Sequence, residues 1–194
     1  MSACPVCSAP SVPDALVCEY CGTTLRSLVS AAEELEALEA LSRSAQRMAA
    51  ESGGGGLATA YFSQLGLAKG ANQKVAEFWK NAFIPATLPG LERATLLAMS
   101  QLQTDAWKAM WHPGTKAANG AALARLNALG AALRIEIASG SEGSARARAV
   151  LGEADAARER LAAAKRKGMI QYAALVGGSL VFLAIMSGLV LGAN

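Results

Sequence analysis

The sequence predicts a mainly helical protein with a small cysteine-rich segment at its N-terminus and an apolar helix at its C-terminus. Alanine is abundant, while aromatic residues make up only 5% of the 194 residues. Alanine favours helix because it loses no side-chain entropy there, and it has little to pack on a pleated sheet. All four cysteines lie between residues 4 and 21, and residues 170–191 carry no charge. The net charge of +3 is too small to indicate a dedicated polyanion-binding protein.

The cysteines form two close pairs, Cys4-x2-Cys7 and Cys18-x2-Cys21, separated by ten residues. Each pair can turn tightly enough to direct two thiolates at one ion, and the loop lets the two turns face each other. The spacing is typical of a tetrahedral Cys4 site that leaves no position open for water, so we predict one structural zinc ion. Two disulfides would need an oxidising compartment, and a redox C-x-x-C would need a βαβ context that the sequence lacks.

Residues 2–24 resemble the zinc-ribbon family, whose cysteine turns read C-P-x-C-G and C-x-x-C-G. The second turn, "CEYCG", matches this pattern through Gly22, which can adopt the positive φ that often ends such a turn. The first turn, "CPVCS", keeps Pro5 but has Ser8 where the family usually has glycine. The resemblance implies a ribbon whose four cysteines bind zinc.

The ribbon's charge favours a protein partner over nucleic acid. Residues 1–25 contain Asp14 and Glu19 but no Lys or Arg, and a Zn(Cys)4 centre carries a formal charge of −2. Nucleic-acid binding draws much of its affinity from cations that neutralise phosphates, so it is disfavoured. Val6 and Tyr20, inside the two cysteine turns, are candidate protein contacts. The alternative is that they merely cover the metal.

The sequence predicts a series of helices in the middle of the chain. Ser30-x-x-Glu33 is a capping box that begins a helix reaching about residue 52, and "GGGG" at 53–56 breaks it. Apolar faces over roughly 57–83, 88–111 and 116–138 then predict an antiparallel bundle, followed by a charged helix over 143–167. The aromatic stretch at 75–91 has two interpretations, as part of the core or as an amphipathic segment in a membrane interface.

The C-terminal apolar segment predicts a transmembrane helix. About 22 uncharged residues at 1.5 Å each match a hydrocarbon core of about 30 Å. Lys165, Arg166 and Lys167 precede this segment, so the positive-inside rule predicts a cytoplasmic N-terminus, a C-terminus outside, and contact between these three cations and lipid headgroups. The small residues Ala184, Gly188 and Gly192 are candidates for self-association of the helix as a homo-oligomer, against a lone anchor that faces lipid.

The sequence therefore predicts six segments. They are a zinc ribbon at 1–25, a helix at 26–52, a glycine linker at 53–56, a helical bundle at 57–142, a basic stalk helix at 143–168 and a transmembrane anchor at 169–192. The predicted location is a cytoplasmic membrane of a bacterium, because the alanine- and arginine-rich composition fits a GC-rich genome and no secretory signal opens the chain.

No constellation of catalytic residues is apparent, so an enzyme is not expected. The sole histidine, His112, stands at a helix end where a capping or loop role is the default, and the cysteines are committed to metal. The leading hypothesis is a tail-anchored adaptor or scaffold that organises a protein assembly through its ribbon and bundle. The alternatives are a membrane-sensing or membrane-remodelling regulator that acts through residues 75–91 and the basic stalk, and a membrane-tethered nucleic-acid binder.

Overall fold

The computed structural model describes residues 2–12, 14–53 and 71–191, and for 2, 49–53, 71–74, 113 and 178–191 it describes the backbone alone. Within these residues the protein is mainly helical, as the composition predicts. Two short strands, β1 (Ser2–Ala3) and β2 (Pro10–Ser11), pair antiparallel. The helices are α1 (Ala31–Gly53), α3 (Ala71–Asn81), α4 (Leu88–Ser100), α5 (Ala106–Trp111), α6 (Pro113–Ala138) and α7 (Ser144–Leu191).

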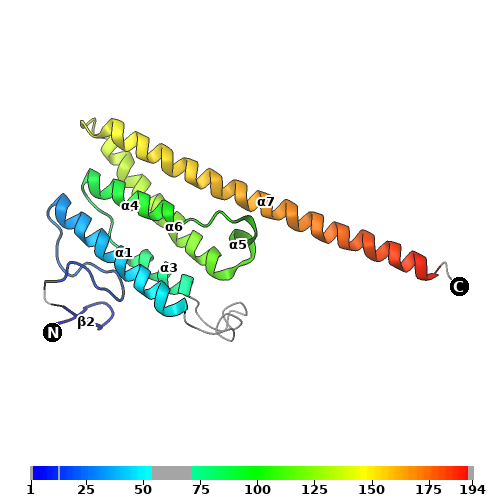
Figure 1. The fold of residues 1–194 in the computed structure, drawn as a ribbon. Helices are drawn as coiled ribbons and strands as arrows, with labels where there is room; N and C mark the ends of the chain where they lie inside the picture. The colour runs from blue at the N-terminus through cyan, green and yellow to red at the C-terminus, as the bar shows by residue number, and fades with distance from the viewer. Residues whose placement is uncertain (1, 13, 54–70, 192–194) are drawn as a thin grey trace.

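Helix α6 is central, because it packs against α3, α4, α5 and α7. Its leucines Leu126, Leu129 and Leu133 are fully buried, and they join Leu38 and Leu41 of α1 in one apolar core. Figure 1 shows α7 lying along one side of this bundle and then continuing well beyond it. The first part of α7 contacts the bundle through a narrow seam of small and apolar residues that includes Ala154, Ala157 and Leu161.

Residues 2–25, which we call the cysteine head, pack against the bundle beside α1 (Figure 1). Leu16 and Val17 of the head are buried in the same core as Leu41 and Phe78. Gly22 approaches α3 so closely that a Cβ atom there would lie 3.0 Å from the carbonyl oxygen of Phe78. The head is thus an integral part of the packed structure.

Several helix ends follow from local capping. The predicted capping box forms, since the Ser30 hydroxyl accepts from the Glu33 N–H at 3.2 Å while the Glu33 carboxylate accepts from the Val29 N–H at 2.9 Å. His112 begins α6, where its Nδ1 accepts from the Thr115 N–H at 3.3 Å. Each cap satisfies an N–H that has no partner inside its own helix.

The predicted helix over 88–111 is broken in the structure into α4 and α5. Asp105 caps α5 by accepting from the Lys108 N–H at 2.8 Å. The buried side chain of Asn119, on α6, accepts from the Gln103 N–H at 2.8 Å and donates to the Gln103 carbonyl at 3.1 Å. A side chain that satisfies both backbone groups of one residue competes with the helical pattern and stabilises the break.

A buried arginine closes the C-terminal end of α3. The Arg125 guanidinium, from α6, donates to the carbonyl oxygens of Trp79, Ala82 and Phe83 at 3.2, 3.0 and 3.1 Å. It also lies 5.3 Å from the Trp79 ring centroid. Burial lowers the pKa of Arg125 to about 10, so the group stays charged at neutral pH and complements the negative end of the helix dipole.

A buried carboxylate complements the positive end of the helix dipole at the start of α4. Glu34 of α1 accepts from the Ala86 and Thr87 N–H groups at 2.7 and 3.1 Å, and also from the Thr87 hydroxyl. Thr87 is the N-cap of α4, so the negative charge stands at the positive end of that helix. Glu34 and Arg125 therefore hold the loop between α3 and α4 from its two ends.

The aromatic residues of the 75–91 stretch contribute mainly to the core. Phe78 and Trp79 are buried and pack edge to face, with ring centroids 5.9 Å apart. Ile84, in the loop that Arg125 and Glu34 hold, is 42% exposed. This burial favours the core interpretation of the stretch.

The predicted transmembrane anchor at 169–192 is wrong. In the part of the chain that the structure describes, no helix combines the length and the apolar character that crossing a membrane requires. Charged residues continue along α7 to Lys167, directly before the predicted anchor. The predicted single-pass topology and membrane location are corrected with it.

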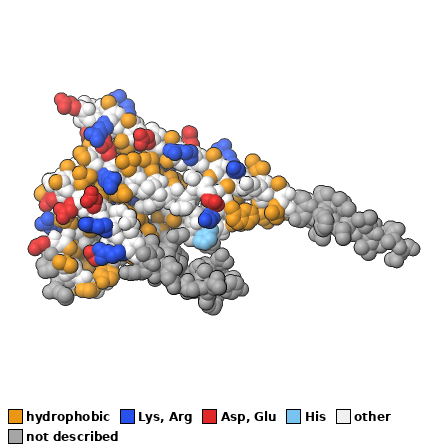
Figure 2. Space-filling view, in the orientation of Figure 1, with side chains coloured by type: hydrophobic (Ala, Val, Ile, Leu, Met, Phe, Trp, Pro, Cys, Tyr) orange, Lys and Arg blue, Asp and Glu red, His pale blue; other side chains and the backbone are white. Residues whose placement is uncertain are grey.

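The beginning of the predicted anchor instead takes part in the fold. Tyr172 of α7 packs on Trp111 of α5, with ring centroids 4.7 Å apart, and Trp107 stands 6.0 Å from Trp111. Figure 2 shows hydrophobic side chains gathered where α7 leaves the bundle. Of the self-association candidates, Gly192 lies outside the described residues, and only the backbone is described at Ala184 and Gly188.

Candidate metal centre

The first cysteine turn, residues 4–9, is closed by two backbone hydrogen bonds. The Cys4 N–H donates to the Ala9 carbonyl at 2.8 Å, and the Ser8 N–H donates to the Cys4 carbonyl at 2.9 Å. Ser8 adopts φ +58°, a left-handed conformation that usually favours glycine. The chain thus makes at Ser8 the turn for which the zinc-ribbon pattern uses glycine.

The second turn, residues 18–23, repeats this geometry. The Cys18 N–H donates to the Thr23 carbonyl at 2.8 Å, and the Gly22 N–H donates to the Cys18 carbonyl at 2.9 Å. Gly22 has φ +75°. Two segments with different side chains therefore form equivalent turns, and each turn presents two sulfur atoms to the other.

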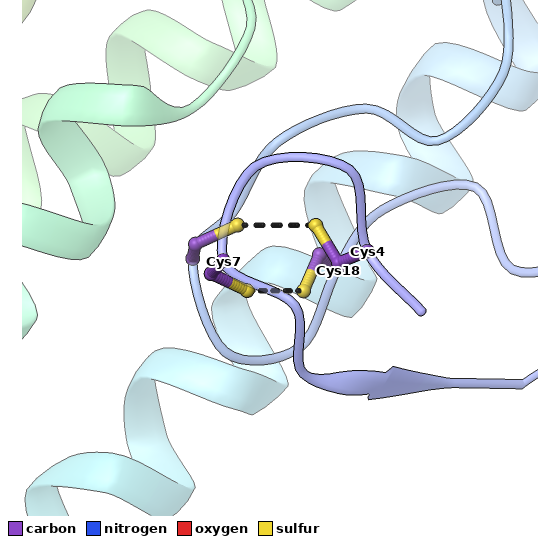
Figure 3. Close-up of side chains that lie close together, drawn as sticks. Cys4, Cys7 and Cys18 are labelled. Atoms are coloured by element: carbon purple, nitrogen blue, oxygen red, sulfur yellow. Dashed lines mark hydrogen bonds between the residues drawn. The ribbon is translucent and has the colours of Figure 1, made fainter. Parts of the chain in front are cut away.

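The four sulfur atoms converge on one point. The Sγ atoms of Cys4 and Cys21 lie 3.7 Å apart, as do those of Cys7 and Cys18 (Figure 3), and all four lie within 4.8 Å of one another. Four thiolates at about 2.3 Å from a tetrahedral zinc ion would be separated by about 3.8 Å. A disulfide bond is about 2.05 Å long, and all four cysteines are free thiols. The cluster can therefore hold a metal ion such as zinc.

The head's backbone already favours thiolate at one of these positions. The N–H groups of Cys7 and Val6 donate to the Cys4 sulfur and lower the pKa of Cys4 to about 6. Burial has the opposite effect at Cys18 and raises its pKa to about 12. A bound dication supplies the charge that would keep all four groups as thiolates at neutral pH.

The donor set determines what kind of metal centre this is. Among the described residues, these cysteines form the one group of three or more His, Cys, Asp or Glu side chains with metal-ligating geometry. Four protein ligands complete a tetrahedral shell, whereas catalytic zinc sites keep a position for water. The four cysteines can thus supply a complete ligand shell to a metal ion.

The predicted protein contacts, Val6 and Tyr20, occupy equivalent places in the two turns, two residues after Cys4 and Cys18 respectively. Their side chains are 63% and 62% exposed. Their backbone N–H groups donate to the sulfurs of those same two cysteines. The backbone is thus directed at the metal centre while the side chains face outward.

The other predicted site residues lie elsewhere. Lys165, Arg166 and Lys167 are on α7, outside the metal centre, and Arg166 and Lys167 are exposed. Their contact with lipid headgroups stays a prediction. Sequence reasoning missed a groove beside the head, whose lining includes Val12 and Glu36. Its only sequence signal is the absence of Lys and Arg from residues 1–25.

Comparison of the chain with protein-family models, with curated proteins and with solved structures finds no match.

Proposed function

We propose that this protein is a non-enzymatic adaptor whose zinc-loaded cysteine head binds a protein partner while the helical bundle serves as its rigid base. The observation that carries this proposal is the outward placement of Val6 and Tyr20 at equivalent positions of the two cysteine turns. Apolar and aromatic side chains on a rigid base favour protein contact because they lose little conformational entropy on binding.

Zinc is the metal that best suits the head. Four thiolates are soft ligands, and a closed tetrahedral sulfur shell is typical of structural zinc or of iron–sulfur chemistry. The 3.7 Å sulfur separations suit a single ion at the centre of the shell. The paired cysteine turns also support the resemblance to zinc ribbons.

The position of the sole histidine supports a binding role over catalysis. His112 uses its Nδ1 to cap α6, where it accepts from the Thr115 N–H. An enzyme would need converging nucleophilic or titratable groups with an open site. In the described residues the cysteine cluster is the one group with metal-ligating geometry, and its shell is complete when a metal binds.

Charge argues for a protein partner over a nucleic acid. The head carries Asp14 and Glu19 without a cation, and a metal bound by four thiolates would add a formal charge of −2. Such a surface repels phosphate. Protein binding is therefore the function that this charge distribution supports.

Affinity capture with the full-length zinc-loaded chain tests this function. The wild type is compared with the Val6→Ser/Tyr20→Ser double variant. The control is Val29→Ser/Ile135→Ser, whose targets are 84% and 72% exposed and belong to neither cysteine turn. We expect a partner that the wild type and control retain and that the test variant loses by about tenfold or more.

Zinc content must be equal in all three proteins, so that loss of binding reports the surface and not the fold. A partner list that is the same for the test variant and the wild type would refute the proposal. A gel shift of DNA or RNA at moderate salt that disappears on chelation would favour the nucleic-acid alternative.

A further inference from the structure

A groove of about 410 Å³ runs between the cysteine head and α1. One wall comes from residues 10–12, 14–17, 19 and 20 of the head, and the other from Glu36 and Ala40 of α1. Figure 1 shows these two elements side by side. The volume is within the range of binding pockets and suits a few side chains of a bound segment.

Apolar side chains line part of this groove. Val12 and Tyr20 are 68% and 62% exposed, while Leu16 is buried beneath them and anchors the wall in the core. Exposed apolar side chains on a wall that is packed into the core are suited to contact with another apolar side chain. Tyr20 links the groove to the surface proposed for partner binding.

Carboxylates also line this groove. Asp14, Glu19 and Glu36 all border the groove. Glu19 pairs with Arg47 at 3.2 Å, but both side chains are more than half exposed, so this ion pair is weak. Asp14 and Glu36 have no ion-pair partner within the described part of the chain.

The metal centre strengthens this negative field. The head has no Lys or Arg of its own, and four thiolates on a dication leave a formal charge of −2 a few residues from the groove. Unpaired carboxylates beside a net negative cluster attract a cation and repel an anion. The groove therefore favours a ligand that is both apolar and positively charged.

We propose that this groove binds an extended protein segment in which a Lys or Arg adjoins an apolar side chain. The cation lies between Asp14 and Glu36, and the apolar side chain lies against Val12 and Tyr20. This inference rests on the proposed adaptor function and names the chemistry of its partner.

Selection from a random dodecapeptide phage library on the full-length, zinc-loaded protein tests the inference. We expect enrichment of peptides that place Lys or Arg next to an apolar residue. The best peptide, made synthetically with a fluorescent label, is then titrated by anisotropy. Its affinity should fall roughly tenfold in Asp14→Asn/Glu36→Gln, and it should weaken with added salt.

The matched control is Glu142→Gln/Glu153→Gln, which removes the same charge from exposed positions outside the groove and should bind like the wild type. Selection of acidic peptides, no enrichment at all, or equal affinity for the groove variant and the wild type would overturn the inference. Self-association of the wild type in ultracentrifugation that the groove variant abolishes would also overturn it, because a second copy presenting Lys165–Lys167 would then be the occupant.

Failure of this inference is separable from failure of the adaptor function. Should the groove variant keep the captured partner while Val6→Ser/Tyr20→Ser loses it, the adaptor function holds and the groove proposal fails. Should the wild type capture no protein at all, the function itself fails.

Discussion

The cysteine head and the helical bundle are stabilised in different ways. In the described part of the head, the regular structure consists of two strands of two residues each and one β-bridge between Val17 and Thr24, and the buried hydrophobic side chains apart from the cysteines are Leu16 and Val17. The bundle buries leucines from several helices in a continuous core. A segment as short as the head cannot bury enough surface to fold by itself, so we expect ligation of a metal ion by its four sulfurs to add to the stability that it gains from packing on the bundle.

Two buried charges also stabilise the bundle. Glu34 and Arg125 are buried charges whose partners are backbone groups at the ends of α4 and α3. Each is compensated by several hydrogen bonds and by a helix dipole of opposite sign. We therefore expect the head to depend on one metal ion, whereas the bundle depends on packing and on two charges that fix a loop.

Removal of the metal should have the largest effect, and it should affect the head much more than the bundle. Structural zinc sites contribute about 10–16 kcal/mol of binding free energy, which is coupled to folding. After chelation we expect residues 2–25 to lose their amide protection in hydrogen exchange, while the far-UV circular dichroism of the bundle persists. Some loss of bundle stability should follow, because Leu16 and Val17 leave the shared core. Head amides that stay protected in metal-free protein would contradict this account.

Arg125→Met should have the next largest effect. It keeps an unbranched side chain but removes the guanidinium donor from the carbonyls of Ala82 and Phe83, whereas the Trp79 carbonyl keeps the Ala82 N–H as a donor at 3.3 Å. Unsatisfied buried groups of this kind cost about 1–3 kcal/mol each, so we expect a loss of about 3 kcal/mol or more in chemical denaturation. Arg93→Met, at an exposed position of α4, is the control and should change stability by less than about 0.5 kcal/mol.

Glu34→Gln should have a smaller effect. The amide keeps one acceptor for the Ala86 or Thr87 N–H but removes the charge at the start of α4. We expect a loss of about 1–2 kcal/mol in the free energy of unfolding, since hydrogen bonds to charged groups are worth about 1.5–3 kcal/mol. Glu39→Gln, on the exposed side of α1, should be nearly neutral. An equal effect of the two substitutions would show that Glu34 does not anchor the loop.

The smallest effect concerns the two cysteine turns. Ser8→Gly removes the strain of a left-handed non-glycine residue, worth about 1 kcal/mol, but adds chain entropy to the unfolded state. We expect a slight gain in zinc affinity, by a few-fold, in competition with a chelator. Gly22→Ala should weaken binding, because its Cβ would strain the backbone and approach Phe78. Weaker binding by Ser8→Gly, or tighter binding by Gly22→Ala, would contradict the equivalence of the turns.

Features that depend on residues close together in the chain were predictable from the sequence. The cysteine cluster needs only two short turns, and the Ser30–Glu33 capping box closes within one helical turn. Contacts between residues far apart in the chain were not predictable. The break between α4 and α5 depends on Asn119, sixteen residues from Gln103, and Glu34 reaches Thr87 across fifty-three positions.

The prediction of a membrane anchor was wrong for a related reason. Hydropathy over a window treats a segment as if it had no neighbours in the fold. In the structure the first residues of that segment continue a charged helix, and Tyr172 packs against Trp111 of α5. No sequence pattern indicated that α5 would lie beside this part of α7. The groove beside the head was missed for the same reason, because it forms only when Glu36 of α1 faces the head.

X-ray absorption spectroscopy of the purified full-length protein tests the central claim most directly, because it reports the metal's own ligands. The account predicts one zinc ion per chain, surrounded by four sulfur atoms at about 2.3 Å, with no nitrogen or oxygen neighbour. A shell with fewer than four sulfurs, or a protein mass that reveals a disulfide among the four cysteines, would contradict it.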